Sequence, residues 1–144
     1  MTKRKIRAEA GFTLLEILLV VVIIGMLVSI AAVKIGGQSQ KAKLVATQRQ
    51  IDAYKTTLGV YELENGFYPS TEQGLQALIT QPATPPVPAN WKGPYLDPPV
   101  VRPDPWGHDY IYKNPGTRNP TGYDLYSLGP TGVEGDPGNI GNWQ

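Results

Sequence analysis

The feature that most constrains this chain is one long apolar stretch close to its N-terminus. Residues 12–33 read FTLLEILLVVVIIGMLVSIAAV, with a single charged side chain at Glu16. A helix rises about 1.5 Å per residue, so such a stretch matches the roughly 30 Å hydrocarbon core of a bilayer. We therefore expect an apolar helix that crosses a membrane.

The charges on either side of this stretch predict its orientation. Four lysines and arginines within residues 3–7 precede it, whereas only Lys34 follows closely. Basic residues are retained on the cytoplasmic side of a membrane. We therefore expect a cytoplasmic N-terminus and export of everything after Val33.

The exported part is large enough for one small domain. The chain has 14 Pro and 16 Gly, mostly after Phe67, which indicates a loop-rich domain with short strands. It has no cysteine, so a disulfide cannot supply the extra stabilisation that such a small domain needs. A bound metal and contacts with other copies are the sources to consider. The sequence has no basic patch of the kind that would indicate binding to a nucleic acid.

A second helical pattern continues from the first. Apolar side chains recur at helical spacing at Leu44, Ile51, Tyr54, Leu58 and Tyr61. Asn65-Gly66 predicts the end of the helix, because glycine readily adopts the left-handed conformation of a helix cap. We expect one long helix that ends there.

Shorter elements are expected between this helix and residue 103. Ser70 and Gln73 have the spacing of a capping box, which predicts a short helix over residues 70–79. The prolines that follow predict an extended loop, in which Trp91 and Tyr95 act as anchors.

The last third of the chain predicts a small antiparallel sheet. Residues 104–107 read DPWG, a turn signal, and residues 110–112 and 123–128 are β-prone. Residues 129–143 are so rich in glycine, proline, Asp and Asn that we expect no regular element there. The predicted fold class is α+β, with a long N-terminal helix packed on a small domain of short strands and long loops.

The start of the apolar stretch predicts where the chain is processed. A secretory signal cut after small residues such as Ser29 and Ala31 is one interpretation. Such signals have apolar regions of roughly 7 to 15 residues and seldom contain an acid. A cut between Gly11 and Phe12, which would retain the helix, fits the sequence better.

Glu16 needs a partner in this setting, because a carboxylate in the hydrocarbon region costs about 2.5 to 3.5 kcal/mol. Cleavage before Phe12 would create an α-amino cation one helical turn away or on a neighbouring subunit. A packed bundle of such helices favours the pair between subunits, which would fix their axial register. The alternative is a carboxylate near the interface that is hydrated or protonated.

The run from Gly11 to Glu16 reads GFTLLE after a basic leader, and it resembles the class III signal of type IV pilins and type II secretion pseudopilins. Further segments resemble the major pseudopilin of type II secretion. They are residues 68–71, 73–75, 104–107, 124–129 and 140–143. The resemblance covers nearly the whole chain.

This resemblance implies a type IV pilin-like fold and a non-enzymatic role. Residues 1–11 would be a leader removed by prepilin peptidase, which also N-methylates Phe12. Residues 12–33 would be a transmembrane and polymerisation helix, surrounded by inner-membrane lipid before assembly, and residues 34–144 a periplasmic domain. Glu16 would support assembly of a homopolymer with minor pseudopilins, driven by an inner-membrane platform and its ATPase, for protein export across the outer membrane.

The resemblance also implies a calcium site in the C-terminal loop. The candidate ligands are the carbonyls of Leu128 and Val133 and the side chains of Asp136 and Asn139. Thr131 and Asn139 stand where the family usually has aspartates, so a calcium ion, which takes about 6 to 8 oxygen ligands, would be bound weakly or not at all. The alternative is a loop held by packing of Ile140 and Trp143.

Two other classes of protein are alternatives. A type IV pilin for adhesion or motility would share the GFTLLE motif, but many such pilins close a C-terminal loop with a cysteine pair that this chain lacks. An enzyme or sugar-binding module would need a cluster of functional groups. His108 beside Asp109 is the one candidate base, and a single histidine in a turn without a paired nucleophile is typical of a surface residue. The aromatic residues are expected to form the core.

Overall fold

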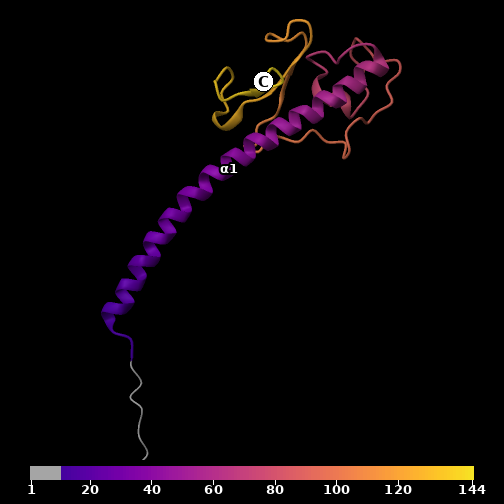
Figure 1. The fold of residues 1–144 in the computed structure, drawn as a ribbon. Coiled ribbons are helices and arrows are strands. Elements are labelled where there is room, and N and C mark those ends of the chain that lie inside the picture. The colour runs from indigo at the N-terminus through magenta and orange to yellow at the C-terminus, as the bar shows by residue number, and fades with distance from the viewer. Residues whose placement is uncertain (1–10) are drawn as a thin grey trace, which may run out of the picture. The chain divides into compact units, whose positions relative to one another are not determined.

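The structure is a computed structural model that describes residues 11–144, except for the side chains of residues 30–36. The expected leader peptide therefore lies outside the described residues apart from Gly11. The elements follow in the order α1 (Leu14–Asn65), η1 (Gly74–Leu78), β1 (Ile111–Lys113), β2 (Asp124–Ser127), η2 (Gly129–Thr131) and β3 (Ile140–Gly141) (Figure 1). The chain divides into two compact units, Met1–Gln40 and Lys41–Gln144.

The long helix expected from the sequence is confirmed as α1, which has 52 residues. It ends at the predicted stop, where Gly66 has a φ of 83° and its N–H donates to the carbonyl of Glu62 at 2.7 Å. The side-chain amide nitrogen of Asn65 donates to the backbone carbonyl of Tyr61 at 2.9 Å. The first bond is the last backbone bond of the helix, and the second ties the Asn65 side chain back to the preceding turn.

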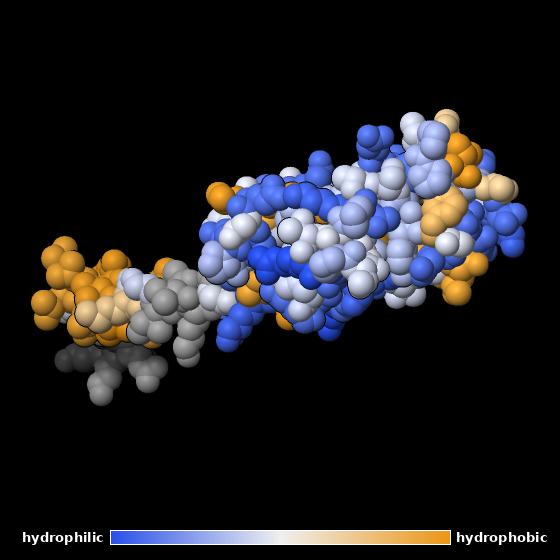
Figure 2. Space-filling model, turned by 90° about the horizontal axis from the view of Figure 1, so that it is seen from above, coloured by the Kyte–Doolittle hydropathy of each residue, from blue (hydrophilic) through white to orange (hydrophobic). Residues whose placement is uncertain are grey.

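The N-terminal part of α1 carries hydrophobic side chains that gather visibly in Figure 2. Within the described part of the chain, no helix is both long and apolar enough to cross a membrane, in contrast to the span expected over residues 12–33. Residues 30–33 of that span are among those whose side chains lie outside the described part.

The core of the unit Lys41–Gln144 forms on one face of α1. Ile51, Tyr54, Leu58 and Tyr61 are all at most 1% exposed and recur at helical spacing, as predicted. Leu44 is the exception, since it is 41% exposed and Thr47 is buried in the adjoining turn. The visible surface of this unit is mainly hydrophilic (Figure 2).

Other elements pack their apolar residues against this face. The cluster includes Leu75 and Leu78 from η1, and Tyr110, Tyr112, Tyr123, Leu125 and Ile140 from the sheet region. The tyrosines of this unit therefore belong to the core or pack against it, as the sequence predicted. Several of their rings meet edge to face, for example Tyr54 and Tyr110 with ring centroids 5.4 Å apart.

The sheet has the order β1-β2-β3 and is antiparallel throughout. β1 and β2 lie within one residue of the predicted strands. The third strand was missed, because the composition of residues 129–143 predicts no regular element. Ile140 pairs with Ser127 and Gly141 with Tyr126, so pairing with a buried neighbouring strand outweighs the weak local preference of this segment.

The segment between α1 and the sheet also follows the prediction in part. The Ser70–Gln73 capping box forms, with bonds of 3.0 and 3.3 Å between side chain and backbone in both directions. The helix after it is shorter than expected, since only η1 is regular. Trp91 anchors the proline-rich loop by donating to the carbonyl of Ala77 at 2.9 Å, and Tyr95 donates to Glu64 at 2.7 Å.

Candidate functional site

The N-terminal motif lies at the very start of α1. Gly11, Phe12 and Thr13 precede the helix, and the side chain of Phe12 is 78% exposed. Thr13 caps the helix, since its hydroxyl oxygen accepts a hydrogen bond from the N–H of Glu16 at 3.2 Å. The bond between Gly11 and Phe12, where cleavage is expected, is therefore outside the helix.

Glu16 is the acidic residue in the first turn of α1 and is exposed. Thr13 and Glu16 have the Thr-x-x-Glu spacing of a capping box, a signal that the sequence analysis did not use. A carboxylate at this position also stabilises the positive end of the helix dipole. The nitrogen of Phe12 is an amide in the uncleaved chain, so its expected ion pair with Glu16 stays a prediction.

The helix around Glu16 is apolar on every side. Each large hydrophobic residue from Phe12 to Val28 is at least 47% exposed. These residues are Phe12, Leu14, Leu15, Ile17, Leu18, Leu19, Val20, Val21, Val22, Ile23, Ile24, Met26, Leu27 and Val28. A helix that is hydrophobic all round is one that lies in a membrane or in the core of an assembly.

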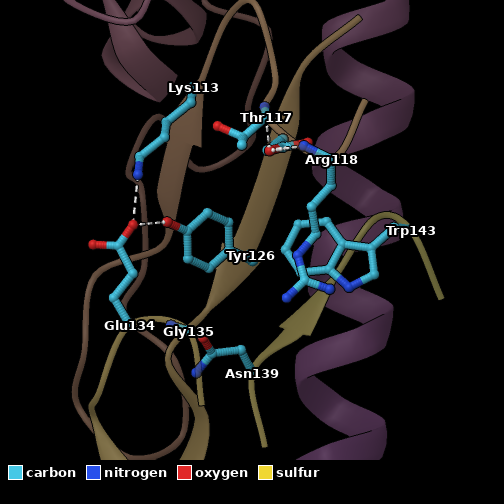
Figure 3. Close-up of a pocket in the computed structure, with 9 residues that line it drawn as sticks. Lys113, Thr117, Arg118, Tyr126, Glu134, Gly135, Asn139 and Trp143 are labelled. Atoms are coloured by element: carbon cyan, nitrogen blue, oxygen red, sulfur yellow. Dashed lines mark hydrogen bonds and ion pairs between the residues drawn. The ribbon is translucent and has the colours of Figure 1, made fainter. Parts of the chain in front are cut away.

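The C-terminal loop is organised around the buried side chain of Asn139. Its amide nitrogen donates to the carbonyls of Leu128 at 3.0 Å and Val133 at 2.9 Å. Its amide oxygen accepts from the N–H of Gly135 at 2.8 Å, as Figure 3 shows. The structure thus brings together three of the four residues that the resemblance assigned to calcium.

The fourth residue, Asp136, is used within the loop. Its carboxylate accepts a hydrogen bond from the N–H of Gly138 at 2.7 Å. Among the described residues, no group of three or more carboxylate, imidazole or thiol side chains is placed to hold a metal ion. Packing of the end of the loop, the alternative expectation, is also present, since Ile140 is 6% exposed and Trp143 lies 5.4 Å from Tyr126 between ring centroids.

The remaining acid of the loop, Glu134, faces a polar pocket (Figure 3). Its carboxylate accepts hydrogen bonds from Lys113 and from the hydroxyl of Tyr126. The Lys113 ammonium, with a smaller effect of Tyr126, holds the pKa of the Glu134 carboxyl below its usual range. Burial, reinforced by Glu134, raises the pKa of Tyr126.

Two buried aspartates organise the segments that carry the resemblance. The carboxylate of Asp104, in the DPWG turn, accepts from the N–H groups of Trp106 at 3.0 Å and His108 at 2.8 Å. The carboxylate of Asp124, on β2, accepts from three consecutive backbone N–H groups, those of residues 117–119, at 2.7 to 2.9 Å. These aspartates are structural, since each closes a loop that contains proline.

Comparisons with known proteins identify the family of this chain and match both its N-terminal motif and its C-terminal unit. A family model described as "Type II secretion system (T2SS), protein G" matches residues 34–143, well over half of the chain. The chain belongs to this family. A second model, described as "Prokaryotic N-terminal methylation motif", matches residues 6–32, which contain Gly11, Phe12 and Glu16.

Individual relatives match over nearly their full length. The type II secretion system core protein G of Pseudomonas aeruginosa is 45% identical over 141 residues, which cover 95% of this chain and 96% of the relative. The core protein G of Vibrio cholerae is 42% identical, with 97% and 95% covered. A crystal structure of the major pseudopilin from the type 2 secretion system of enterohaemorrhagic Escherichia coli matches with a TM-score of 0.67 and 39% identity, covering 74% of this chain and 87% of that one.

These findings confirm the resemblance to the major pseudopilin and the pilin-like α+β fold. The chain is a structural subunit of the type II secretion pseudopilus rather than of a surface pilus, the alternative. The roles of Gly11, Phe12 and Glu16 and the use of calcium stay predictions.

Proposed function

We propose that this subunit is stored in the inner membrane through residues 12–33, with its N-terminus in the cytoplasm, and polymerises into a periplasmic pseudopilus that drives protein export. The apolar surface on all sides of α1 from Phe12 to Val28 carries this proposal. A monomer in water would leave that surface exposed at high cost, whereas lipid or neighbouring helices would cover it. Assembly would replace contacts with lipid by contacts with neighbouring helices.

Prepilin peptidase would prepare the subunit by cutting between Gly11 and Phe12 and methylating the new amino group. The position of this bond before the first turn of α1 supports the assignment, because proteolysis concentrates in exposed segments outside regular elements. The match of the methylation motif to residues 6–32 supports the same step.

Glu16 would then pair with the amino group of Phe12 on a neighbouring subunit. In a bundle of apolar helices an unpaired carboxylate is expensive, and an opposite charge within a few ångströms offsets that cost. Only one axial offset between neighbours brings the two groups together, so the pair would select the register of the filament.

The subunit would contribute no catalytic group. His108 lies beside the buried Asp104, with Nδ1 3.5 Å from Oδ2. The hydroxyl of Ser127 donates to the same Asp104 carboxylate and accepts from the N–H of Gly129. The aspartate therefore stands between the histidine and the serine, whereas a nucleophilic serine needs the histidine next to it. The energy for export would come from a cytoplasmic ATPase and an inner-membrane platform, with minor pseudopilins as further partners.

Replacement of Glu16 in the native host tests the proposed assembly role. Glu16→Ala should leave the chain in the membrane fraction and abolish filaments and secretion. Glu16→Gln separates two roles, because glutamine keeps the capping-box geometry at this position but not the charge. Asp52→Ala removes an exposed carboxylate from the same helix and serves as the matched control.

Loss of assembly in Glu16→Gln together with normal assembly in Asp52→Ala is the expected result. Normal filaments and secretion in Glu16→Gln would show that the residue acts as a helix cap, and the proposed ion pair would be wrong.

A further inference from the structure

The C-terminal loop between β2 and β3 is closed by one side chain. Asn139 is 5% exposed, and its carboxamide makes three hydrogen bonds, to Leu128, Val133 and Gly135. These three residues lie at separate points of the loop, so the bonds hold three parts of it together. The backbone of Asn139 also accepts a hydrogen bond from the side chain of Gln144 at 3.2 Å.

The orientation of the carboxamide follows from the chemistry of its partners. The carbonyl oxygens of Leu128 and Val133 can only accept hydrogen bonds, so the NH₂ group must face them. The backbone N–H of Gly135 can only donate, so the amide oxygen must face it. Both hydrogens of the NH₂ group are therefore used, and the reverse orientation would oppose like groups at all three contacts.

The same two carbonyls are the ones that the family resemblance assigns to a calcium ion. Here each already accepts a hydrogen bond from Asn139, at 3.0 and 2.9 Å. A calcium ion needs about 6 to 8 oxygen ligands at about 2.3 to 2.6 Å. The NH₂ group lies where such an ion would have to contact both carbonyls, and it offers no lone pair.

The nearby carboxylates do not supply the missing oxygen ligands. Asp136 accepts from the N–H of Gly138, and Glu134 is turned toward Lys113 and Tyr126 (Figure 3). Thr131, at a position where the family resemblance implies an aspartate, is exposed. The residues present in the loop therefore do not fit a calcium ion.

We infer that the carboxamide of Asn139 takes the place of a cation in this subunit, so that the loop folds and stays closed without calcium. Its NH₂ group presents two polarised hydrogens to two carbonyl oxygens, as a cation would present positive charge. An aspartate at this position would instead place anionic oxygens against the same carbonyls, and the loop would close only around a cation.

The unmutated full-length chain in detergent provides the first test. Its unfolding midpoint, and hydrogen–deuterium exchange of a peptide covering residues 128–139, would be measured in a calcium chelator and in about 10 mM calcium, well above the weakest protein affinities of about 1 mM. Both quantities are expected to be the same in the two buffers. A midpoint or a protection of the loop that rises with calcium would overturn the inference.

Two substitutions provide the second test. Asn139→Asp should increase exchange in residues 128–139 in the chelator, and added calcium should reverse part of that increase. Asn90→Asp introduces the same charge at an exposed position and should leave the exchange unchanged. Exchange in Asn139→Asp equal to that of the parent chain in the chelator would contradict the role of the NH₂ group. The measurement on the unmutated chain decides the matter even if Asn139→Asp does not fold.

Discussion

The substitution Leu58→Ala tests whether the face of α1 that begins at Ile51 is the centre of the core. Leu58 is 0% exposed and lies among the clustered side chains of η1 and the sheet region. Replacement of a fully buried leucine by alanine costs about 2.7 to 5.0 kcal/mol, because it removes apolar contacts and leaves a cavity. For a unit of about 100 residues, each kcal/mol lowers the melting temperature by roughly 4 to 8 °C. We expect a decrease of at least about 10 °C.

Near-ultraviolet circular dichroism of the full-length chain in detergent measures this decrease. All three Trp and all eight Tyr lie between Tyr54 and Trp143, so the signal reports only the unit Lys41–Gln144. Leu63→Ala is the matched control, since Leu63 is on the same helix and 85% exposed. Its effect should stay within about 0.5 kcal/mol. Equal melting temperatures for the two variants would refute the assignment of the core.

Three further predictions follow from the unit Lys41–Gln144. Gly129→Ala should lower the melting temperature, at a cost of about 1 to 3 kcal/mol, because φ is 67° and a Cβ would lie 2.4 Å from the carbonyl oxygen of Gly138; Gly122→Ala, with no atom within 4 Å, should not. Burial raises the pKa of Tyr110 and Tyr123 to about 12. Their protonated forms therefore contribute folding stability that is fully present below pH about 10 and is lost as the pH rises. Tyrosinate absorbance and unfolding should then appear together. Because the pKa of Glu134 is lowered, its ionised form contributes folding stability that is present above pH about 4.3 and is lost as the pH falls. Glu134→Gln should therefore make the melting temperature depend less on pH in the acid range.

The long helix and its core face could be predicted because their signals are local. The helical spacing of Ile51, Tyr54, Leu58 and Tyr61 and the Asn65-Gly66 stop each depend on residues close in sequence, and the structure confirms them. The capping box at Ser70 is a signal of the same kind.

The features that the sequence analysis missed depend on partners far along the chain. β3 exists because Ile140 and Gly141 pair with β2, and nothing in the composition of residues 129–143 indicates such pairing. The contacts of Asn139 likewise depend on how the loop folds back on itself. The family resemblance implies that an asparagine stands in place of an aspartate there, but not that its NH₂ group meets two carbonyls.

The proposed function requires that this chain matures into a polymerising subunit that keeps its apolar helix. Intact mass and N-terminal sequencing of the protein from membranes of its native host would show whether it does. The mature chain is expected to begin at N-methylated Phe12 and to retain residues 12–33. A chain that begins at Ala32, or one that still carries Met1 in assembled material, would contradict it.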